Sequence, residues 1–546
     1  RTLSKMYSNR FIVLQIVGLV LAASIALYYP RAVNITPLFS SEIRCPIPVY
    51  IDTLDHEKTQ YFLHDTDFRQ YAVKRFSRAI QVDTVIDEHM LEFSKFQNFH
   101  NYLQKEFPLV YKSAEVTIVN EFGLLFEFHG KDRDLKPVLL MAHQDTVPFG
   151  AIEEWEHHPL SGDYDDTKVF GRGTNDVKGL LVGIMGAMTE ILKVDPNHQF
   201  QRSVIFAFGY DEEISGNHGA KHISAHLLEK YGPDSIDHIL DEGAPMLIEL
   251  NNNSFGFVVT AEKGYVDLHV GVYTPGGHSS NPKDFTAIGA LSRFLSNYEK
   301  DKFEALLPDN NPMLNLFECV AEQGSFPTMS KVIAKLSRDN PLAKSILTER
   351  LLQNDLFEYT VRTSQAIDII HGGDKNNALP LNATALINHR ITIGNDLNTV
   401  LQKAIKHGKL IAEELGLGLE ANSTVIIPAT DNGILKIEHS DYRQVAPVTP
   451  AYDDHWFRLT SYMKTFYEKE VYPGKFNDTP YIITPTAMQG NTDTVHYWKL
   501  SKHIYRTQPG VTNLFEAHMH GTNEYVHIET HLQVIAFYYN YLLGIC

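Results

Sequence analysis

The chain has 546 residues, of which 43% are hydrophobic and 21% charged, a composition ordinary for a folded protein. Its formal net charge of −18 argues against a nucleic-acid partner, because phosphate binding needs a basic surface. The three cysteines, Cys45, Cys319 and Cys546, allow at most one disulfide and leave an odd thiol, which excludes a disulfide scaffold and a cysteine-based zinc site. Any zinc bound here would use His, Asp and Glu side chains.

The chain begins with an uncharged apolar run from Phe11 to Tyr29, close to the ~20 residues that a helix needs to cross a bilayer. Cations lie mainly before this run, and only Arg31 follows it closely. The positive-inside rule therefore predicts a cytosolic tail at residues 1–10, a transmembrane signal anchor at 11–29 and a lumenal remainder. A cleaved signal peptide and a buried soluble helix are the alternatives.

Five Asn-x-Ser/Thr sequons lie behind this segment. They begin at Asn34, Asn252, Asn382, Asn422 and Asn477. Sequons also occur by chance, but several of them behind a signal anchor are typical of a glycosylated ectodomain. Together these features predict a single-pass type II membrane glycoprotein.

The first part of the ectodomain alternates helical and strand patterns. After a polar stalk with a first helix at Asp65–Ala79 (residues 30–80), we expect an amphipathic helix at Met90–Phe107 and a helix at Gly179–Leu192. Apolar runs predict strands at Glu115–Val119, Leu124–Phe128, Pro137–Ala142 and Ser203–Phe208. Residues 81–262 are therefore predicted to begin an α/β domain whose mixed sheet is mostly parallel.

The pattern changes after residue 262. Alternating strands are predicted at Tyr265–Val272 and Ala383–Ile391, and helices at Thr286–Tyr298 and Leu397–Leu415. We interpret residues 263–428 as a smaller inserted α+β domain. Residues 429–546 would then return to the first domain.

Five clusters of metal-capable side chains follow along the chain, and each has an ordinary structural explanation when taken alone. They are His143-Gln144-Asp145 after an apolar strand, Asp176 in GRGTNDVKG, Asp211-Glu212-Glu213 after another strand, Asp241-Glu242, and His520-Gly-Thr-Asn-Glu524. A surface histidine, an N-cap aspartate or a solvated acidic loop would account for them singly. The ends of strands are also where α/β active sites gather. His518 and His527 are rival candidates near the last cluster.

Taken in order, the motifs HxD, GxxDxKG, DEE, DEG and HGxNE resemble the M20 family of zinc peptidases and aminoacylases, and within it the carboxypeptidase S branch. The resemblance covers roughly residues 80–540 and implies a zinc-peptidase catalytic domain with an inserted lid. It implies two zinc ions held by His143, Asp176, Glu213, Glu242 and His520, with Asp176 shared between them. Asp241 stays open as an alternative to Glu242.

The same resemblance assigns chemical roles. Glu212 would be the general base that takes a proton from a water shared by the metals, which leaves a bridging hydroxide, and Asp145 would orient a zinc-ligating histidine. In the lid, His278 of PGGHSS would stabilise the oxyanion, while Asn377 and Arg390 would contact substrate. Arg390 suits a substrate carboxylate, which a guanidinium binds in a bidentate manner.

One position departs from the family pattern. The motif Gly490-Asn-Thr-Asp-Thr494 is followed by Val495, where the relatives usually have an arginine. If that arginine grips the substrate carboxylate, its replacement would weaken binding or shift the preference of the enzyme.

The sequence therefore predicts a di-zinc carboxypeptidase that acts on short peptides in a lumenal compartment, by analogy the vacuole. An N-acyl-amino-acid amidohydrolase is an alternative with the same chemistry. A non-catalytic membrane glycoprotein that keeps the fold is the alternative from a different class.

Overall fold

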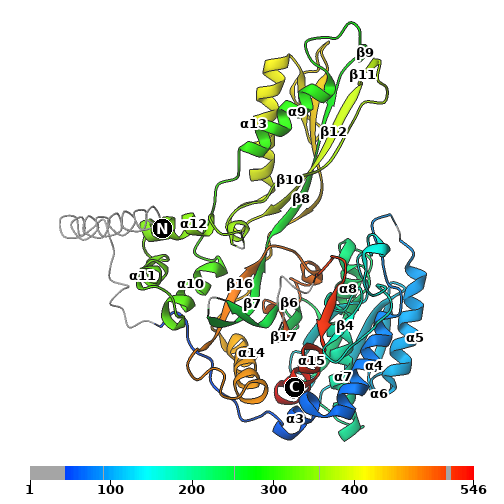
Figure 1. The fold of residues 1–546 in the computed structure, drawn as a ribbon, viewed down its shortest axis with the longest axis vertical. Helices are drawn as coiled ribbons and strands as arrows, with labels where there is room; N and C mark the ends of the chain where they lie inside the picture. Colours follow the sequence, from blue (N-terminus) through cyan, green and yellow to red (C-terminus); the bar gives the residue numbers. More distant parts are fainter. Residues whose placement is uncertain (1–42, 90, 251, 356, 512–517) are drawn as a thin grey trace, which may run out of the picture.

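The computed structural model of the protein describes residues 43–89, 91–250, 252–355, 357–511 and 518–546. It contains a large body built on an eight-stranded sheet and an elongated lid built on a six-stranded sheet (Figure 1). The predicted anchor at 11–29 and the sequon at Asn34 lie outside the described residues. Among the helices that the structure describes, none combines the length and apolar character needed to cross a membrane.

The large sheet has the strand order β1-β2-β5-β3-β6-β17-β7-β16. Its strands are β1 (Glu115–Val119), β2 (Gly123–Phe128), β3 (Val138–His143), β5 (Val204–Gly209), β6 (His238–Leu250), β7 (Asn253–Glu262), β16 (Tyr481–Met488) and β17 (Ile504–Val511). The central strands β5, β3, β6 and β17 run parallel, as do β7 and β16, whereas β1 and β2 are antiparallel. The sheet is therefore mixed, with a parallel centre.

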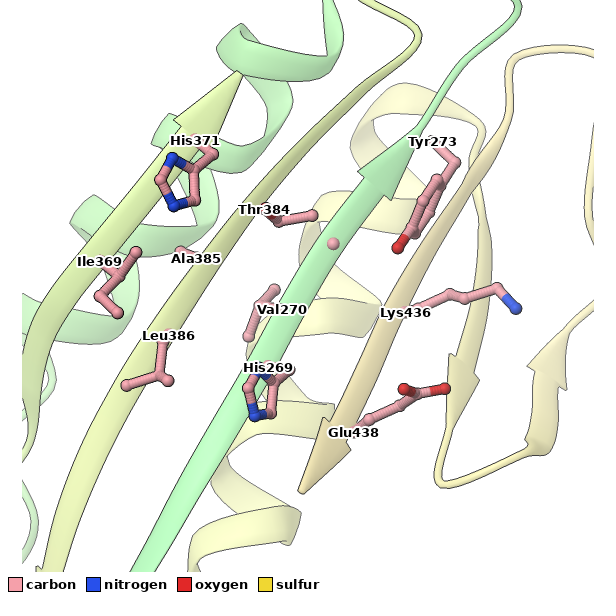
Figure 2. A pocket seen from close by; sticks show the side chains of 11 residues that line it. His269, Val270, Tyr273, Ile369, His371, Thr384, Ala385, Leu386, Lys436 and Glu438 are labelled. Atoms are coloured by element: carbon pink, nitrogen blue, oxygen red, sulfur yellow. The ribbon is translucent and has the colours of Figure 1, made fainter. Parts of the chain in front are cut away.

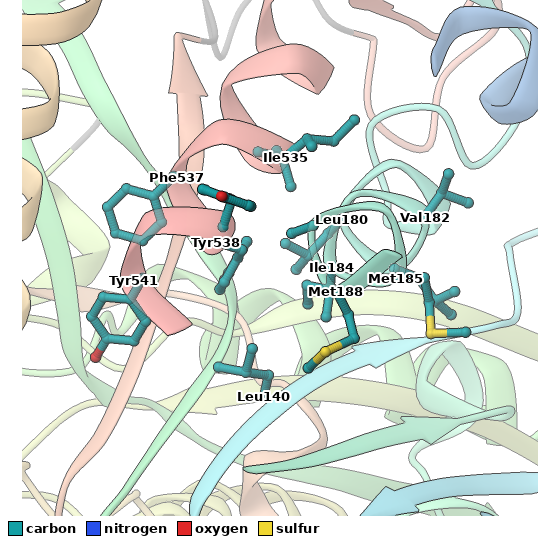
Figure 3. Close-up of a cluster of buried hydrophobic side chains, with 14 of the residues drawn as sticks. Leu140, Leu180, Val182, Ile184, Met185, Met188, Ile535, Phe537, Tyr538 and Tyr541 are labelled. Carbon is teal, nitrogen blue, oxygen red and sulfur yellow. The ribbon is translucent and has the colours of Figure 1, made fainter. Parts of the chain in front are cut away.

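Helices cover both faces of this sheet, which explains why the central strands β3 and β5 are buried along their whole length. One face carries α3 (His56–His64), α4 (Thr66–Ile80), α5 (Phe96–Glu106), α6 (Pro108–Ser113), α7 (Lys178–Val194), α14 (Asp454–Thr465) and α15 (Ile528–Ile545). The other carries α8 (Ala220–Tyr231). Figure 3 shows α7 and α15 packing over Leu140 of β3. Helix α7 is buried on nearly every side, so its apolar residues are not confined to one stripe.

The lid sheet has the order β10-β12-β8-β15-β13-β14. Its strands are β8 (Gly264–Tyr273), β10 (Ala366–Gly372), β12 (Asn382–Ile391), β13 (Gly418–Ala421), β14 (Thr424–Ile427) and β15 (Ile434–Arg443). Two helices, α9 (Ala287–Lys300) and α13 (Leu397–Leu415), pack on one face. The Thr286 side chain caps α9, and α13 runs from its N-cap Asp396 to Gly416, which adopts the left-handed conformation (φ 63°).

The lid differs from the predicted insert at 263–428 in two ways. Strand β15 belongs to the lid sheet, although it follows residue 428, because the polar Asp431-Asn432-Gly433 stretch is a turn into β15 and not a linker between domains. Helices α10 (Pro312–Gln323), α11 (Thr328–Leu336) and α12 (Pro341–Leu351) lie within the predicted range but pack around Phe255 of β7 and Ile482 of β16. A spacing pattern does not show which sheet a helix covers.

Four of the predicted glycosylation sites lie in the described part of the chain. The side chains of Asn252, Asn382, Asn422 and Asn477 are all exposed. Asn382 begins β12, and Asn422 lies in the turn between β13 and β14. Their modification stays a prediction.

One disulfide joins Cys45 to Cys319 of α10, while Cys546 is a free, buried thiol. The bond fastens the segment around residue 45 to the edge of the large body. Backbone amides of Arg44 and Cys45 also donate to Glu322 at 3.1 Å, so the segment is held by several contacts.

We expect the double variant C45S/C319S to unfold at a lower temperature than the wild type, because a cross-link that closes a long loop typically contributes ~2–4 kcal/mol. Calorimetry and limited proteolysis near residue 45 measure the effect. C546S is the matched control, since that thiol is not bridged. An unchanged melting temperature in the double variant would show that the remaining contacts hold the segment without the bond.

Candidate active site

Six side chains from five segments meet at the carboxyl ends of the parallel strands. His143 ends β3, Glu212 and Glu213 follow β5, and Glu242 lies within β6. Asp176 precedes α7, and His520 precedes β18 (Tyr525–His527), which pairs with β4 (Lys168–Phe170). The edge formed by the ends of parallel strands is where an α/β sheet places its ligands.

An irregularity in β6 turns Glu242 towards this cluster. The pairing of β6 with β17 shifts register between Asp241 and Ala244, so Glu242 and Gly243 have no partner in the ladder. Gly243 has a φ of 150°, and a Cβ there would lie 2.5 Å from the Arg506 carbonyl oxygen. Only glycine fits this position, and the bulge re-aims the neighbouring carboxylate.

Asp176 lies between two histidines. Its Oδ1 is 3.1 Å from His143 Nε2, and its Oδ2 is 2.9 Å from His520 Nε2. Glu242 Oε1 lies 3.3 Å from His143 Nε2, and Glu213 Oε2 lies 3.3 Å from His520 Nε2. The cluster thus contains two groups, each with one histidine and one glutamate, that share a single aspartate.

The cluster carries more acidic groups than its two histidines can neutralise. Burial, reinforced by the charge of Asp176, raises the pKa of Glu213 to about 7 and that of Glu242 to about 8. Burial and the charge of Glu242 also raise the pKa of Glu212 well above its usual value. Hydrogen bonds to Asp176 and Glu213 raise the pKa of His520 to about 10. Buried carboxylates this close together raise one another's pKa values, and a bound cation would stabilise their charged forms.

The donor set fits a divalent metal. The ligand atoms of His143, Asp176 and Glu213 lie within 4.8 Å of one another, as do those of His143, Glu212 and Glu242. Buried Oε1 of Glu213 accepts no hydrogen bond from the described residues. Imidazole and carboxylate ligands with no thiolate suit zinc among the biological metals.

Asp145 holds two of these residues in place. Its carbonyl oxygen is 3.1 Å from His143 Nδ1, and its Oδ1 is 3.3 Å away, so the other ring nitrogen faces the cluster. Its Oδ2 accepts from the backbone amide of Glu213 at 3.0 Å. This geometry suits the orienting role that the resemblance implies.

Glu524 is a supporting residue to which the sequence analysis gave no role. It is fully buried and accepts from Arg172 Nη1 at 2.6 Å and from the backbone amides of Gly173 and Asn175 at 3.0 and 2.9 Å. It therefore holds the loop that presents Asp176. The sequence contains both partners, since Arg172 lies in GRGTND and Glu524 in HGTNE, but no local pattern shows that these two distant residues form an ion pair.

A second buried network stands behind the cluster. Glu262 accepts from Thr492 and Thr494 at 2.9 and 3.1 Å and pairs with Arg506 at 2.9 Å. It fixes the Gly490–Thr494 motif to β7, from which the chain enters the lid. The motif thus helps to fix the end of β7, where the chain passes from the large body into the lid.

The alternative ligands do not join the cluster. Asp241 is buried, but its neighbour Glu242 is the residue that faces His143. His518 Nδ1 lies 2.8 Å from the Thr522 carbonyl oxygen within its own loop, and His527 belongs to β18. Neither belongs to a described metal-capable group.

The lid residues divide between its two ends. His278 is exposed on β9 (Gly277–His278), which pairs with β11 (Ala378–Leu379) directly after Asn377. Figure 1 shows both strands at the far tip, so His278 and Asn377 are not brought to the cluster in this chain. Arg390, at the opposite end of β12, donates to Asn491 Oδ1 of the large body at 3.0 Å.

A cavity of about 430 Å³ lies elsewhere, on the open face of the lid sheet (Figure 2). Its lining includes His269, His371 and Glu438 from three different strands. It shares no residue with the metal-capable cluster, and it plays no part in the chemistry below.

We expect E524Q to weaken zinc binding by about 10- to 100-fold, the usual effect of losing a residue that positions metal ligands. It also leaves Arg172 buried without its partner, which costs roughly 3–5 kcal/mol of stability. Competition with a chelating dye and thermal melts measure the two effects. E529Q is the matched control, because Glu529 is exposed on the same segment.

Comparison with known proteins supports the motif-based resemblance. A family model described as peptidase family M20/M25/M40 matches residues 139–544. The chain is 36% identical over 503 residues to carboxypeptidase S of Saccharomyces cerevisiae, covering 88% of this chain and 85% of the relative. It is 30% identical over 480 residues to the N-fatty-acyl-amino acid synthase/hydrolase PM20D1 of Xenopus tropicalis, covering 86% and 85%.

Solved structures share the fold at low identity. The dipeptidase Dug1p of Saccharomyces cerevisiae matches with a TM-score of 0.62 at 15% identity, covering 90% of this chain and 98% of that one. Human carnosine dipeptidase 1 matches with a TM-score of 0.60 at 13% identity, covering 89% and 98%. The chain therefore belongs to the M20/M25/M40 peptidase family, and it is a metallopeptidase of that family.

Proposed function

We propose that the protein is a two-zinc carboxypeptidase that removes the C-terminal residue from short peptides. The observation that carries this proposal is the pair of histidine–glutamate groups that share Asp176. His143, Asp176 and Glu242 would hold one ion, and His520, Asp176 and Glu213 the other. The identity to carboxypeptidase S supports the substrate class.

The chain's own residues supply the proton transfer. Zinc bound in this cluster would polarise the scissile carbonyl and acidify a water molecule. Glu212, which belongs to the group with His143 and Glu242, takes a proton from the attacking water and passes it to the leaving amine nitrogen. The carbon–oxygen bond forms first and leaves an oxyanion; the carbon–nitrogen bond then breaks as the amine leaves with the proton from Glu212, and the products are a carboxylate and an amine.

The proposed role of His278 requires movement or a second molecule. Because β9 lies at the tip of the lid, its imidazole reaches a metal cluster only if the lid closes or if the tip meets the cluster of another copy. Its Nδ1 lies 2.7 Å from Ser280 Oγ, a contact that fixes the ring while Nε2 stays available to an oxyanion.

We also propose that the protein is an anchored, lumenal glycoprotein, by analogy of the vacuole. The apolar run at 11–29 and the exposed sequons support this location. The Cys45–Cys319 bond supports it as well, because disulfides persist in oxidising compartments.

Hydrolysis of N-acyl amino acids is the second candidate. A relative named for that activity aligns over 86% of this chain. The same cluster and the same base would cleave either amide, so the two candidates differ only in the group on the acyl side of the scissile bond.

The proposal is tested by incubating the purified protein with a blocked dipeptide such as an N-acyl-Gly-Leu. We expect leucine release that is lost with chelator and restored by zinc, because the carboxylate cluster works only with its cations. No release from protein that holds two zinc ions would reject the carboxypeptidase proposal and leave the N-fatty-acyl substrate to be assayed in the same way.

We expect E212Q to keep two zinc ions and to lower kcat by about 10²- to 10⁴-fold, the usual contribution of a general base. Elemental analysis and steady-state kinetics measure both quantities. E153Q, a neutralisation of an exposed glutamate, is the control. Full turnover in E212Q would remove Glu212 from its role as base, and loss of zinc would reassign it as a ligand.

A further inference from the structure

We propose that Arg443 acts together with Arg390 to bind the free carboxylate of the substrate. The inference rests on the proposed function, in which the substrate ends in a carboxylate. It names a specificity-determining residue that the sequence motifs do not include.

The two arginines flank one tyrosine at the root of the lid. Tyr265 of β8 is in register with Arg390 of β12 on one side and with Arg443 of β15 on the other. Residues directly opposite in antiparallel strands project from the same face of a sheet. The Arg390 guanidinium lies 4.6 Å from the centre of the Tyr265 ring. Tyr265 therefore faces an arginine in each of the two neighbouring strands, and the Arg390 guanidinium lies over its ring.

A bulge in β15 brings Arg443 to this face. The pairing runs without interruption from Ile434 to Ser440, which opposes Asp267, and then gains one residue before Arg443 opposes Tyr265. Asp441 within the bulge has a φ of 47°. In an uninterrupted ladder Tyr442 would oppose Tyr265, but here Tyr442 packs with the core beneath the lid helices. Bulges of this kind re-aim side chains beside active sites.

Arg443 also touches the loop of the proposed base. Its Nη2 donates to the carbonyl oxygen of Ser215 at 3.2 Å, in the loop that carries Glu212 and Glu213. The residue after Val495, His496, has its Nε2 3.0 Å from the same carbonyl oxygen. Arg443 thus places a guanidinium beside the segment that contains Val495 and His496.

Neither arginine is neutralised by a direct carboxylate partner, although the charges of Asp267 and Glu212 act on Arg390 from further away. Within the described part of the chain, neither guanidinium forms an ion pair with a carboxylate, and both side chains are half-buried. Asp267 is engaged by Tyr265 and Asn388 at 2.8 and 2.9 Å. Burial and the charge of Arg443 lower the pKa of Arg390. A substrate carboxylate would supply the missing charge, and a guanidinium is the best side chain to receive it.

The test compares acid and amide forms of one ligand. Zinc-loaded wild type and R443M are assayed with N-acyl-Gly-Leu and with its C-terminal amide. We expect R443M to raise the KM for the acid by about 10- to 100-fold, as expected for losing a charge-assisted hydrogen bond, and to leave kcat/KM for the amide unchanged. R443K should recover part of the loss, and R443M/V495R should recover more. R293M is the control, because Arg293 is an exposed residue paired with Glu414.

A KM for the acid that is the same in R443M as in the wild type would overturn the inference. An equal loss of kcat for acid and amide would overturn it too, because it would make Arg443 only a support for the Ser215 loop. If the wild type cleaves neither ligand, the proposed function fails, and calorimetric binding of N-acyl-leucine and its amide decides the inference separately. A preference of the wild type for the acid that disappears in R443M supports it, and an equal preference in both proteins refutes it.

Discussion

The arrangement of the site depends on the position of one carboxylate, Asp176, between two histidines, His143 and His520, that are far apart in the sequence. A histidine at residue 143 and another at residue 520 contact its two oxygens, so the site exists only when the chain has folded back on itself. Glu524, four residues after the second histidine, joins the two distant segments directly, because it accepts hydrogen bonds from the backbone beside Asp176. The β4–β18 pair fixes the same two segments a second time.

The two bodies divide the work of the enzyme. The large body concentrates acidic groups at the ends of its parallel strands, while the root of the lid concentrates cations that have no acidic partner there. A peptide with a free C-terminus has its last amide bond next to a carboxylate. In the proposed complex the amide would face the metal-capable cluster of the large body, and the carboxylate would face the cations at the root of the lid. The joint itself is neutralised internally by Glu262 and Arg506, and among the residues that the structure describes neither Arg390 nor Arg443 forms an ion pair, as the proposed carboxylate site requires.

Local features of the fold were predictable because they depend on neighbouring residues. The helix at Leu397–Leu415 has the predicted bounds, since its amphipathic pattern is framed by Asp396 and Gly416. The strand VLLMAH and the histidine at its end were equally readable from a run of apolar residues. The metal-capable motifs were recognised for a different reason: each is ambiguous alone, but their order along the chain resembles that of the M20 family.

The features that sequence did not reveal all depend on contacts between distant residues. Nothing local in Pro312–Leu351 shows that these helices cover the large sheet, and nothing in PGGHSS shows that His278 lies at the tip of the lid.

The bulge in β15 determines which side chain of that strand faces Tyr265. If the same β15 sequence paired with β8 without the bulge, the phenol of Tyr442 would stand opposite Tyr265 in place of the guanidinium, without any substitution at the site. The residue opposite Tyr265 is therefore set by the pairing of two strands, which a comparison of motif residues does not reveal.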